Sequence, residues 1–489
     1  MTASAPTSGS NGLSRRLGRG AAVAIVVGSV IGSGVFLKPG QIAQDGGDFG
    51  ISILAWILGG GISLIGGLCM CELALMMPQS GGHYVYIREA YGRGPAFLAG
   101  WNDTIMSQPA ANAALAVAGT NALYQLLGQG KSAPPGIVLM MALAVIGLLS
   151  MTNILGVAWG GLVQSITTVI KAGFLVLCAC LPLYFATIGS DVVSFANYST
   201  VNPAAMGESF IDKLALVMVS VMWAYAGWGF IAPVAEEVKD PKKNITTAIV
   251  GGIGILMVIY VAFNVALHSM LPMDRMANAG SSAPQEALYS LFLPSGENYA
   301  QLARDCVSAV IVISTFSAIN SGLLVIPRIT YAMARDGVFF AAFSRTHRRY
   351  RTPVLAIALQ GMMALLMVAG SFVLTQVVEQ YTSKQDMFHL LSDLSVFTSV
   401  FFLMLATSAV IYLRYRQPER ERPYRVPWFP LLPILFLAFS VWFISMVTIQ
   451  SPQDSAIGIA IILLALPVYF LFKSSRKSSP DNAQATPQD

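Results

Sequence analysis

Charged side chains are scarce in this sequence of 489 residues. They make up 11% of the residues, whereas hydrophobic residues make up 55% and the mean hydropathy is +0.65. A water-soluble protein carries about 25% charged residues. The shortage therefore excludes an ordinary soluble protein and indicates a surface that faces lipid. The chain also lacks a long polar linker, so we expect one polytopic membrane domain rather than several soluble domains.

Histidine and cysteine are too few and too scattered to suggest a metal site or an enzyme. The chain has 4 histidines and 5 cysteines, and the cysteines lie in or beside apolar runs. The pairs Cys69/Cys71 and Cys178/Cys180 do not have the spacing of zinc ligands, and no histidine lies near them. The sequence also lacks a nucleophile–base pair and a phosphate-binding loop. We therefore expect no metal, no cofactor and no catalytic residue.

Twelve apolar runs are long enough to cross about 30 Å of hydrocarbon. A basic tail, 1–19, precedes them without a signal-peptide cleavage site, and a polar tail, 474–489, follows and is expected to be disordered. The predicted fold is an all-α polytopic membrane protein with 12 transmembrane helices in a single domain, 20–473. The expected spans are 20–43, 50–77, 94–127, 135–152, 158–187, 212–236, 245–271, 302–334, 353–375, 387–413, 428–449 and 455–472.

Basic residues are distributed unevenly over the segments between these spans. With the N-terminus in the cytoplasm, 21 of the 29 lysines and arginines fall in cytoplasmic segments and 6 in outer segments. Because cytoplasmic loops carry the excess of lysine and arginine, both termini are expected on the cytoplasmic side of a cell (inner) membrane. The net charge of +5 is then a signal of orientation and not of nucleic-acid binding.

Two spans contain small residues where a continuous helix would carry aliphatic side chains. The first is interrupted at 30–38 by Gly32, Ser33 and Gly34, and the sixth at Trp223–Gly229. A helix that breaks within lipid must satisfy its freed backbone groups inside the protein, and discontinuous transporter helices do so around a bound solute. Breaks in spans one and six predict two five-helix repeats of opposite orientation, about 20–187 and 212–413.

The direction of each span gives its break a polarity. Span one runs outward, so the half-helix beginning near Val35 points free N–H groups, with Ser33 and Gly34, at the bilayer middle and suits a carboxylate. Span six runs inward, so the half-helix ending near Trp223 offers carbonyl oxygens that suit an ammonium group. Together the two sites describe an α-amino acid. The alternative is a pair of glycine-rich packing faces.

Several motifs outside the breaks occur in the order found in a known group of carriers. They are Ile31–Phe36, Cys71–Ala74, Pro78–Tyr86, Trp223–Trp228, Glu236–Ile245, Ala334–Gly337, Thr352–Val354 and Leu413–Pro423. With these motifs the sequence resembles the amino acid–polyamine–organocation superfamily, and within it the L-type amino acid transporter family, including its bacterial members. The resemblance covers roughly residues 15–430.

This resemblance implies the inverted five-plus-five fold, with helices 11 and 12 (about 428–472) outside the repeat. It also implies sodium-independent exchange (antiport) of L-amino acids by alternating access. One alternative is a proton-coupled symporter of the same fold, and another is a non-transporting amino acid sensor. Carried over by position, the residues that bind the substrate carboxylate are Ile31, Gly32, Ser33, Gly34 and Val35. Those that receive the amino group are Trp223, Ala224, Tyr225 and Ala226, and the pocket walls are Met106, Ser107, Phe397 and Val400.

Lys171 is a lysine deep inside the fifth span. It lies about 20 Å into that helix at 1.5 Å per residue, where a charge is costly and points to a function. The resemblance implies that its ammonium bonds the carbonyls freed by the first break, at the place where sodium-coupled relatives hold an ion. The alternatives are a lysine whose side chain reaches the membrane interface and a lysine that carries a proton.

Three carboxylates within apolar segments receive other roles. Glu72 and Asp103 lie toward cytoplasmic ends and are expected to form structural pairs, and Asp393 is expected to line the entry path. The proposed pocket then holds no acidic residue, which favours a neutral substrate.

Some eukaryotic members of the family carry a cysteine between spans three and four that tethers a heavy subunit. The segment Gly128–Pro135 has none, so we expect no such partner.

Overall fold

The computed structural model describes residues 17–128, 133–155, 157–205, 208–233, 235–350, 352–377 and 387–477. The expected tails therefore lie mostly outside the described residues, over 1–16 and 478–489. Within the described ranges the chain is almost entirely helical, and extended pairing is limited to two isolated bridges. The all-α fold predicted from composition is confirmed.

The described part of the first half of the chain forms nine helices. A π-helical turn, η1 (Asn102–Met106), separates α6 from α7. The helices are α1 (Arg19–Val30), α2 (Gly34–Leu37), α3 (Pro39–Gly46), α4 (Phe49–Met76), α5 (His83–Tyr91), α6 (Arg93–Trp101), α7 (Ser107–Leu126), α8 (Pro135–Leu155) and α9 (Val157–Thr187).

The second half begins with α10 (Phe210–Ala224), which is followed by a 3₁₀ turn, η4 (Trp228–Ile231), and later by a π turn, η6 (Thr247–Gly251). The remaining helices in this half are α11 (Pro241–Thr246), α12 (Gly252–Met270), α13 (Met273–Ala279), α14 (Ala283–Phe292), α15 (Glu297–Val325), α16 (Pro327–Arg335), α17 (Val354–Val377) and α19 (Met387–Arg416). The last part of the chain forms α20 (Leu431–Gln450), α21 (Pro452–Leu463) and α22 (Ala465–Lys477).

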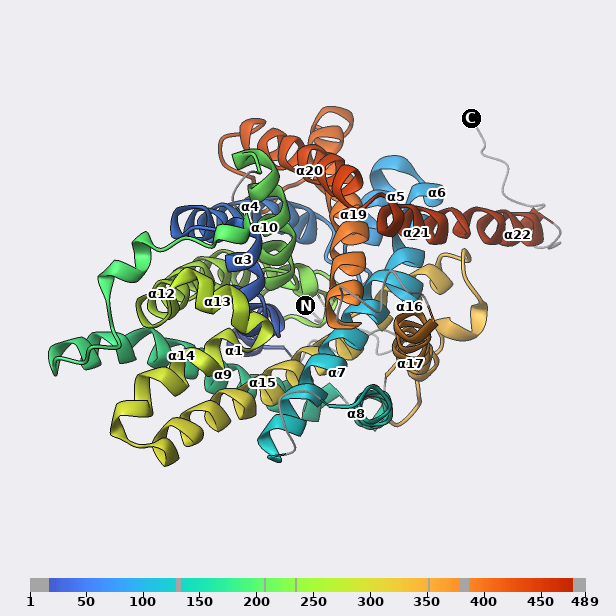
Figure 1. The fold of residues 1–489 in the computed structure, drawn as a ribbon. Coiled ribbons are helices and arrows are strands. Elements are labelled where there is room, and N and C mark those ends of the chain that lie inside the picture. The colour runs from blue at the N-terminus through green and yellow to red at the C-terminus, as the bar shows by residue number, and fades with distance from the viewer. Residues whose placement is uncertain are drawn as a thin grey trace, which may run out of the picture.

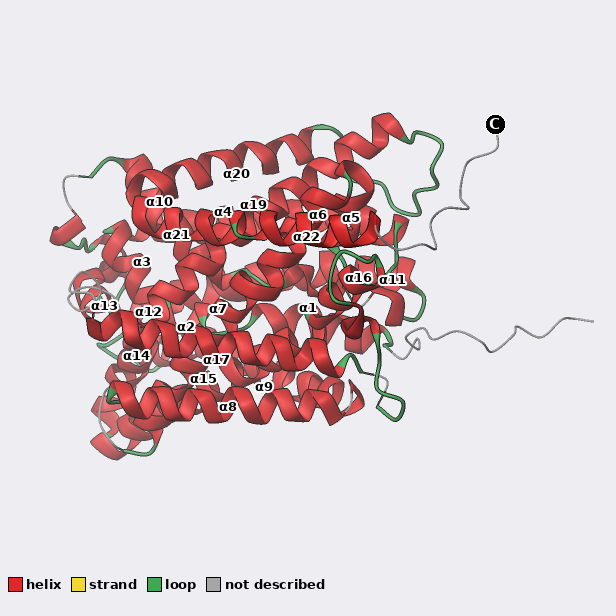
Figure 2. Ribbon diagram, turned by 90° about the vertical axis from the view of Figure 1, so that its right-hand side faces the viewer, coloured by secondary structure: helices red, strands yellow, loops and turns green. Residues whose placement is uncertain are grey.

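The long helices run side by side along one direction, as spans of a bilayer do (Figure 2). Eleven stretches of the described chain are helical and apolar enough to cross a membrane, and each coincides with one of the expected spans. The remaining expected span, 94–127, is formed by α6, η1 and α7, which carry asparagine, glutamine and threonine among their alanines.

The broken first helix lies at the centre of the bundle (Figure 1), packed between α9 and α15. In its most apolar window 83% of the residues are buried, against 28% for α8. Outer helices instead leave large apolar side chains exposed, such as Met140 on α8 and Val169 on α9. An apolar outer surface around an enclosed and interrupted helix is the arrangement that places a polar site midway through a membrane.

Candidate functional site

The first helix stops at Val30, and α2 starts at Gly34. Ile31 leaves the helical conformation with ψ of 80°, and the Gly32 N–H turns back to the Val30 carbonyl at 2.7 Å. Because α2 begins afresh, the N–H groups of Gly34 and Val35 have no intrahelical acceptor, whereas those of Phe36 and Leu37 donate to the Ser33 carbonyl. The predicted break is therefore present at the predicted residues.

Side chains from neighbouring helices satisfy the carbonyls that this break frees. The Ser314 hydroxyl donates to the carbonyls of Ile31 and Gly32, at 2.9 Å each. The Tyr260 hydroxyl donates to the Val30 carbonyl at 3.0 Å. These contacts stabilise the unwound segment even without a bound solute.

Lys171 is fully buried and completes this set of contacts. Its Nζ donates to the carbonyls of Gly28 (2.6 Å) and Ile31 (2.8 Å) and to the Ser317 hydroxyl (3.2 Å). The expected contact between this ammonium and the first break is thus observed. A lysine that reaches the interface is excluded, because every one of these partners lies in the bundle interior.

The second break begins where α10 ends at Ala224. Gly227 follows with φ of +103°, and a Cβ on it would lie 2.9 Å from the Ser29 carbonyl oxygen. A Cβ on Gly34 would overlap the Cα of Ala224. The two breaks therefore touch each other, and only small residues fit at the contact.

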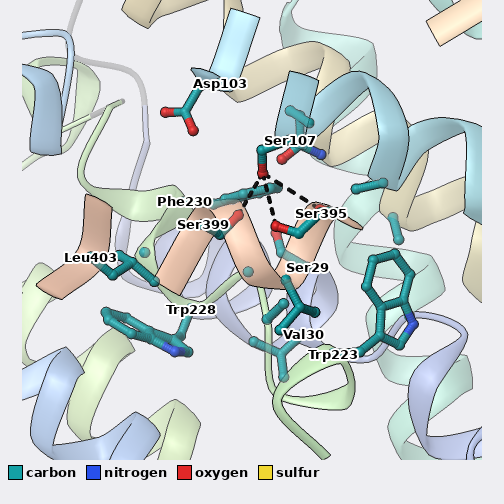
Figure 3. A pocket seen from close by; sticks show the side chains of 18 of the residues that line it. Ser29, Val30, Asp103, Ser107, Trp223, Trp228, Phe230, Ser395, Ser399 and Leu403 are labelled. Atoms are coloured by element: carbon teal, nitrogen blue, oxygen red, sulfur yellow. Dashed lines mark hydrogen bonds between the residues drawn. The ribbon is translucent and has the colours of Figure 1, made fainter. Parts of the chain in front are cut away.

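A cavity of about 160 Å³ opens beside this contact. It is bounded by both breaks, by α7 and by α19 (Figure 3). The predicted site residues that line it are Gly32, Ser33, Gly34, Ser107, Trp223, Ala226 and Val400.

Other predicted site residues lie outside this lining. Ile31, Val35, Met106, Ala224 and Tyr225 are buried in the surrounding packing. Tyr225 donates its hydroxyl to the Trp56 carbonyl at 3.1 Å. Phe397 borders a second cavity on the Lys38 side of the bundle. The pattern predicted segments that border the cavity, but it did not predict which residues of those segments line it.

Three serine hydroxyls form the polar wall of the cavity (Figure 3). Ser107 on α7 is hydrogen-bonded to Ser399 on α19, and its Oγ lies 3.5 Å from Ser395 Oγ. Only Ser107 was predicted. Ser395 and Ser399 sit at an i, i+4 spacing on α19, which puts both on one face, and that spacing was the available signal.

Asp103 also lines the cavity, in contrast to the expectation of a pocket without acidic residues. It lies in the π turn η1, which displaces it from the register of a regular α-helix. Its partner is His83, with Nε2 2.6 Å from Asp103 Oδ2. The predicted pairing of Asp103 is therefore present, but inside the site. Glu72 pairs with Arg414 as expected, with Arg414 Nε 2.9 Å from Glu72 Oε1.

Aromatic and charged contacts close the opposite side of the cavity. The Trp223 indole N–H donates to the Ser33 hydroxyl at 3.1 Å, and its ring meets Phe388 edge-on at 5.9 Å. Beyond this layer Lys38 Nζ contacts Asp393 Oδ1 (3.3 Å) and His389 Nδ1 (3.1 Å). By the predicted orientation this is the outer side, so the cavity faces the cytoplasmic loops.

Metal chemistry finds no support in the described ranges. Nowhere among those residues do three or more histidine, cysteine, aspartate or glutamate side chains gather as a metal site requires. The backbone dipoles of the two breaks and the hydroxyl groups of the cavity wall suit a small zwitterion with a polar side chain.

Comparison with known proteins gives matches over nearly the whole chain. The family model described as amino acid permease matches residues 17–472. The serine/threonine exchanger SteT of Bacillus subtilis (strain 168) is 32% identical over 473 residues, covering 96% of this chain and 99% of that protein. The human cystine/glutamate transporter is 30% identical over 454 residues, covering 92% of this chain and 83% of that protein. The human large neutral amino acids transporter small subunit 2 is 29% identical over 481 residues, covering 95% and 82%.

Proposed function

The chain belongs to the amino acid permease family, and we propose that it exchanges neutral L-amino acids across a cell membrane by alternating access. As a member of this family it is a membrane transporter and not an enzyme. The observation that carries the proposal is the contact of two broken helices beside a cavity. The names of its relatives, which include a serine/threonine exchanger, support exchange.

In the proposed binding mode the substrate lies across the two breaks. Its carboxylate accepts hydrogen bonds from the N–H groups at the start of α2, near Gly34 and Val35, and from the Ser33 hydroxyl. Its ammonium faces the carbonyl end of α10 near Trp223. The side chain then points to the wall of Ser107 and Ser399, which favours a small substrate with a hydroxyl group, such as serine or threonine.

The test is uptake of labelled L-serine into proteoliposomes preloaded with either unlabelled serine or buffer. Exchange requires that internal serine accelerates uptake severalfold, whereas a proton symporter would respond to a proton gradient without internal amino acid. Competition by serine, threonine, alanine, leucine and arginine then ranks the substrates. Absence of binding and of uptake under every condition would favour a different function, and binding without uptake would favour the sensor.

Sodium independence is part of the proposal. The Lys171 ammonium already bonds the Gly28 and Ile31 carbonyls, which are the kind of oxygen ligands that a sodium ion would need beside the first break. Replacing sodium with choline on both sides should leave serine exchange unchanged. A fall in the exchange rate to the background of protein-free liposomes would contradict this part of the proposal.

The proposed setting is a bacterial inner membrane, with both termini in the cytoplasm and without a disulfide-linked heavy subunit. The excess of basic residues in the predicted inner loops supports the orientation. Protease treatment of right-side-out vesicles should leave tags at both ends intact, and the purified chain alone should exchange serine. Cleavage of either tag in sealed vesicles would place that terminus on the outer side and contradict the assigned topology.

A further inference from the structure

The serine wall of the cavity continues into a charged pair. Asp103 precedes Ser107 by four residues, about one helical turn or ~6 Å along the axis. Figure 3 shows its carboxylate beside the hydroxyl cluster and not within it. A serine side chain ends at the hydroxyls, whereas a longer side chain lying along α7 extends to Asp103.

Two unusual stretches of backbone bring Asp103 and His83 together. Asp103 lies in the π turn η1. His83 is the first residue of α5 and follows Gly81 (φ +122°) and Gly82 (φ +52°), conformations that side chains larger than hydrogen avoid. Both side chains are largely enclosed, with exposed fractions of 18% for His83 and 10% for Asp103. Both also line the substrate cavity.

Asp103 is the charge that acts on His83. Burial alone lowers the pKa of His83, but the charge of Asp103 and its hydrogen bond raise it, and the net direction is upward. Arg93 on the adjacent helix α6 is exposed. Other charged groups on the elements around α5 form the pairs Arg88–Asp336, Arg88–Glu89, Arg414–Glu72 and Arg328–Glu237. Arg416 on α19 is exposed.

We propose that the His83–Asp103 pair sets which charge class of amino acid the cavity accepts, by neutralising the Asp103 carboxylate. The proposal rests on the amino acid exchange function given above. While His83 carries its proton, the pair is neutral overall and the cavity offers no net charge to a side chain. Without that proton, Asp103 is an uncompensated buried carboxylate, for which a cationic side chain of lysine or ornithine is the matching partner.

The test is the ability of L-ornithine and L-lysine to compete with labelled L-serine uptake in proteoliposomes. In His83→Gln the side chain keeps its polarity but loses its charge. We expect the concentration of ornithine needed for half-inhibition, relative to that of unlabelled serine, to fall about tenfold or more, since one neutralised buried charge is worth at least that factor. The double variant His83→Gln/Asp103→Asn should restore the wild-type ratio, and His347→Gln, on an exposed loop, should leave it unchanged.

A second measurement follows the pH dependence of the wild-type protein, with Asp103→Asn as its control. Raising the pH equally on both sides, from about 6 to about 9, carries His83 through its proton loss. Since the proton is held below the raised pKa and lost above it, ornithine competition should be weak at low pH and strengthen at high pH. In Asp103→Asn this dependence should vanish.

The outcomes separate the two proposals. If the wild-type protein transports no amino acid, the proposed function fails. If it exchanges serine but ornithine competition is the same at all pH values and in His83→Gln, the inference about the pair is overturned. A pair that only holds α5 in place would lower the rate for all substrates together and leave the ratio of ornithine to serine unchanged.

Discussion

At the scale of single residues, Lys171 links the unwound segment of the first helix to its neighbours. Its ammonium joins α9 to two carbonyls of the break and to Ser317 on α15. The other described side chains that bond the freed carbonyls, Ser314 and Tyr260, come from α15 and α12 and not from α9. The link between the break and α9 therefore depends on one buried charge.

Replacing Lys171 with methionine should abolish exchange. The methionine side chain would fill a similar volume but would leave the Gly28 carbonyl without this donor, at a cost of about 1–3 kcal/mol. The Ile31 carbonyl would keep only its bond from Ser314. We expect serine uptake to fall at least tenfold and the melting temperature in detergent to drop. Lys242→Met, at an exposed lysine before the seventh span, is the control. Wild-type uptake by Lys171→Met would show that the contact is dispensable.

The serine wall gives a second prediction at this scale. Ser399→Ala removes the hydroxyl that pairs with Ser107 and leaves the shape of the cavity nearly unchanged. If substrate hydroxyls bind here, affinity for serine should fall about three- to tenfold, as for one lost hydrogen bond, while affinity for alanine stays the same. Inhibition constants for the two amino acids measure this directly. An equal loss for both would assign the serines to helix packing.

Some residues that line the cavity could be predicted from the sequence, and others could not. Gly34 could be placed at the cavity because a helix that breaks in lipid carries small residues at the break, whereas Trp223 was placed there by the family resemblance. Asp103 was predictable as a paired acid but not as part of the cavity wall. Its position depends on the π turn, which changes the face of the helix on which each following residue lies, and hydropathy does not reveal such a turn.

At the scale of elements, the two broken helices are held at a contact without spare volume. Gly34→Ala places a methyl group where the Ala224 backbone lies. We expect α2 and α10 to be forced apart, with loss of serine binding and a destabilisation of about 1–3 kcal/mol, as for overpacking elsewhere. Gly254→Ala on α12, where a Cβ meets nothing within 4 Å, is the matched control. Serine-binding and melting curves of both variants measure these effects. If the two variants behave alike, the contact between Gly34 and Ala224 can relax without cost.

Most elements were predictable because each span is a long apolar run with polar ends. The expected spans coincide with the observed helices to within a few residues at most ends. Span 94–127 is less apolar than the others. It does not need an apolar surface, because α7 packs against α15 and α19 inside the bundle. The division into inverted repeats stays a prediction.

At the scale of the whole molecule, side-chain contacts separate the cavity beside the two breaks from the Lys38 side, and the cavity extends toward α5. Among the described residues the closing contacts include Trp223 with Ser33, Trp223 with Phe388, and Lys38 with Asp393. Alternating access requires these contacts to separate when the carrier opens to the other side.

Asp393→Asn should shift the carrier toward the state that is open on the Lys38 side. The substitution weakens the attraction to Lys38, and a change of about 1 kcal/mol alters a two-state ratio about fivefold. A single cysteine at Val400, in a background without the five native cysteines, reports the shift. Membrane-impermeant thiol reagent should label it faster from outside and more slowly from inside. Unchanged labelling from both sides would remove Asp393 from the closing contacts.

The contact of Gly34 with Ala224 has a consequence for how such a carrier diverges. Because no side chain larger than hydrogen fits at Gly34, this position has little room for substitution, and in the proposed binding mode it lies beside the carboxylate that all amino acids share. A change of substrate would then come from residues on α7, α19 and the start of α5, which line the rest of the cavity. A constant site for the carboxylate and amino groups, with variable residues around the side chain, would let related carriers transport different amino acids.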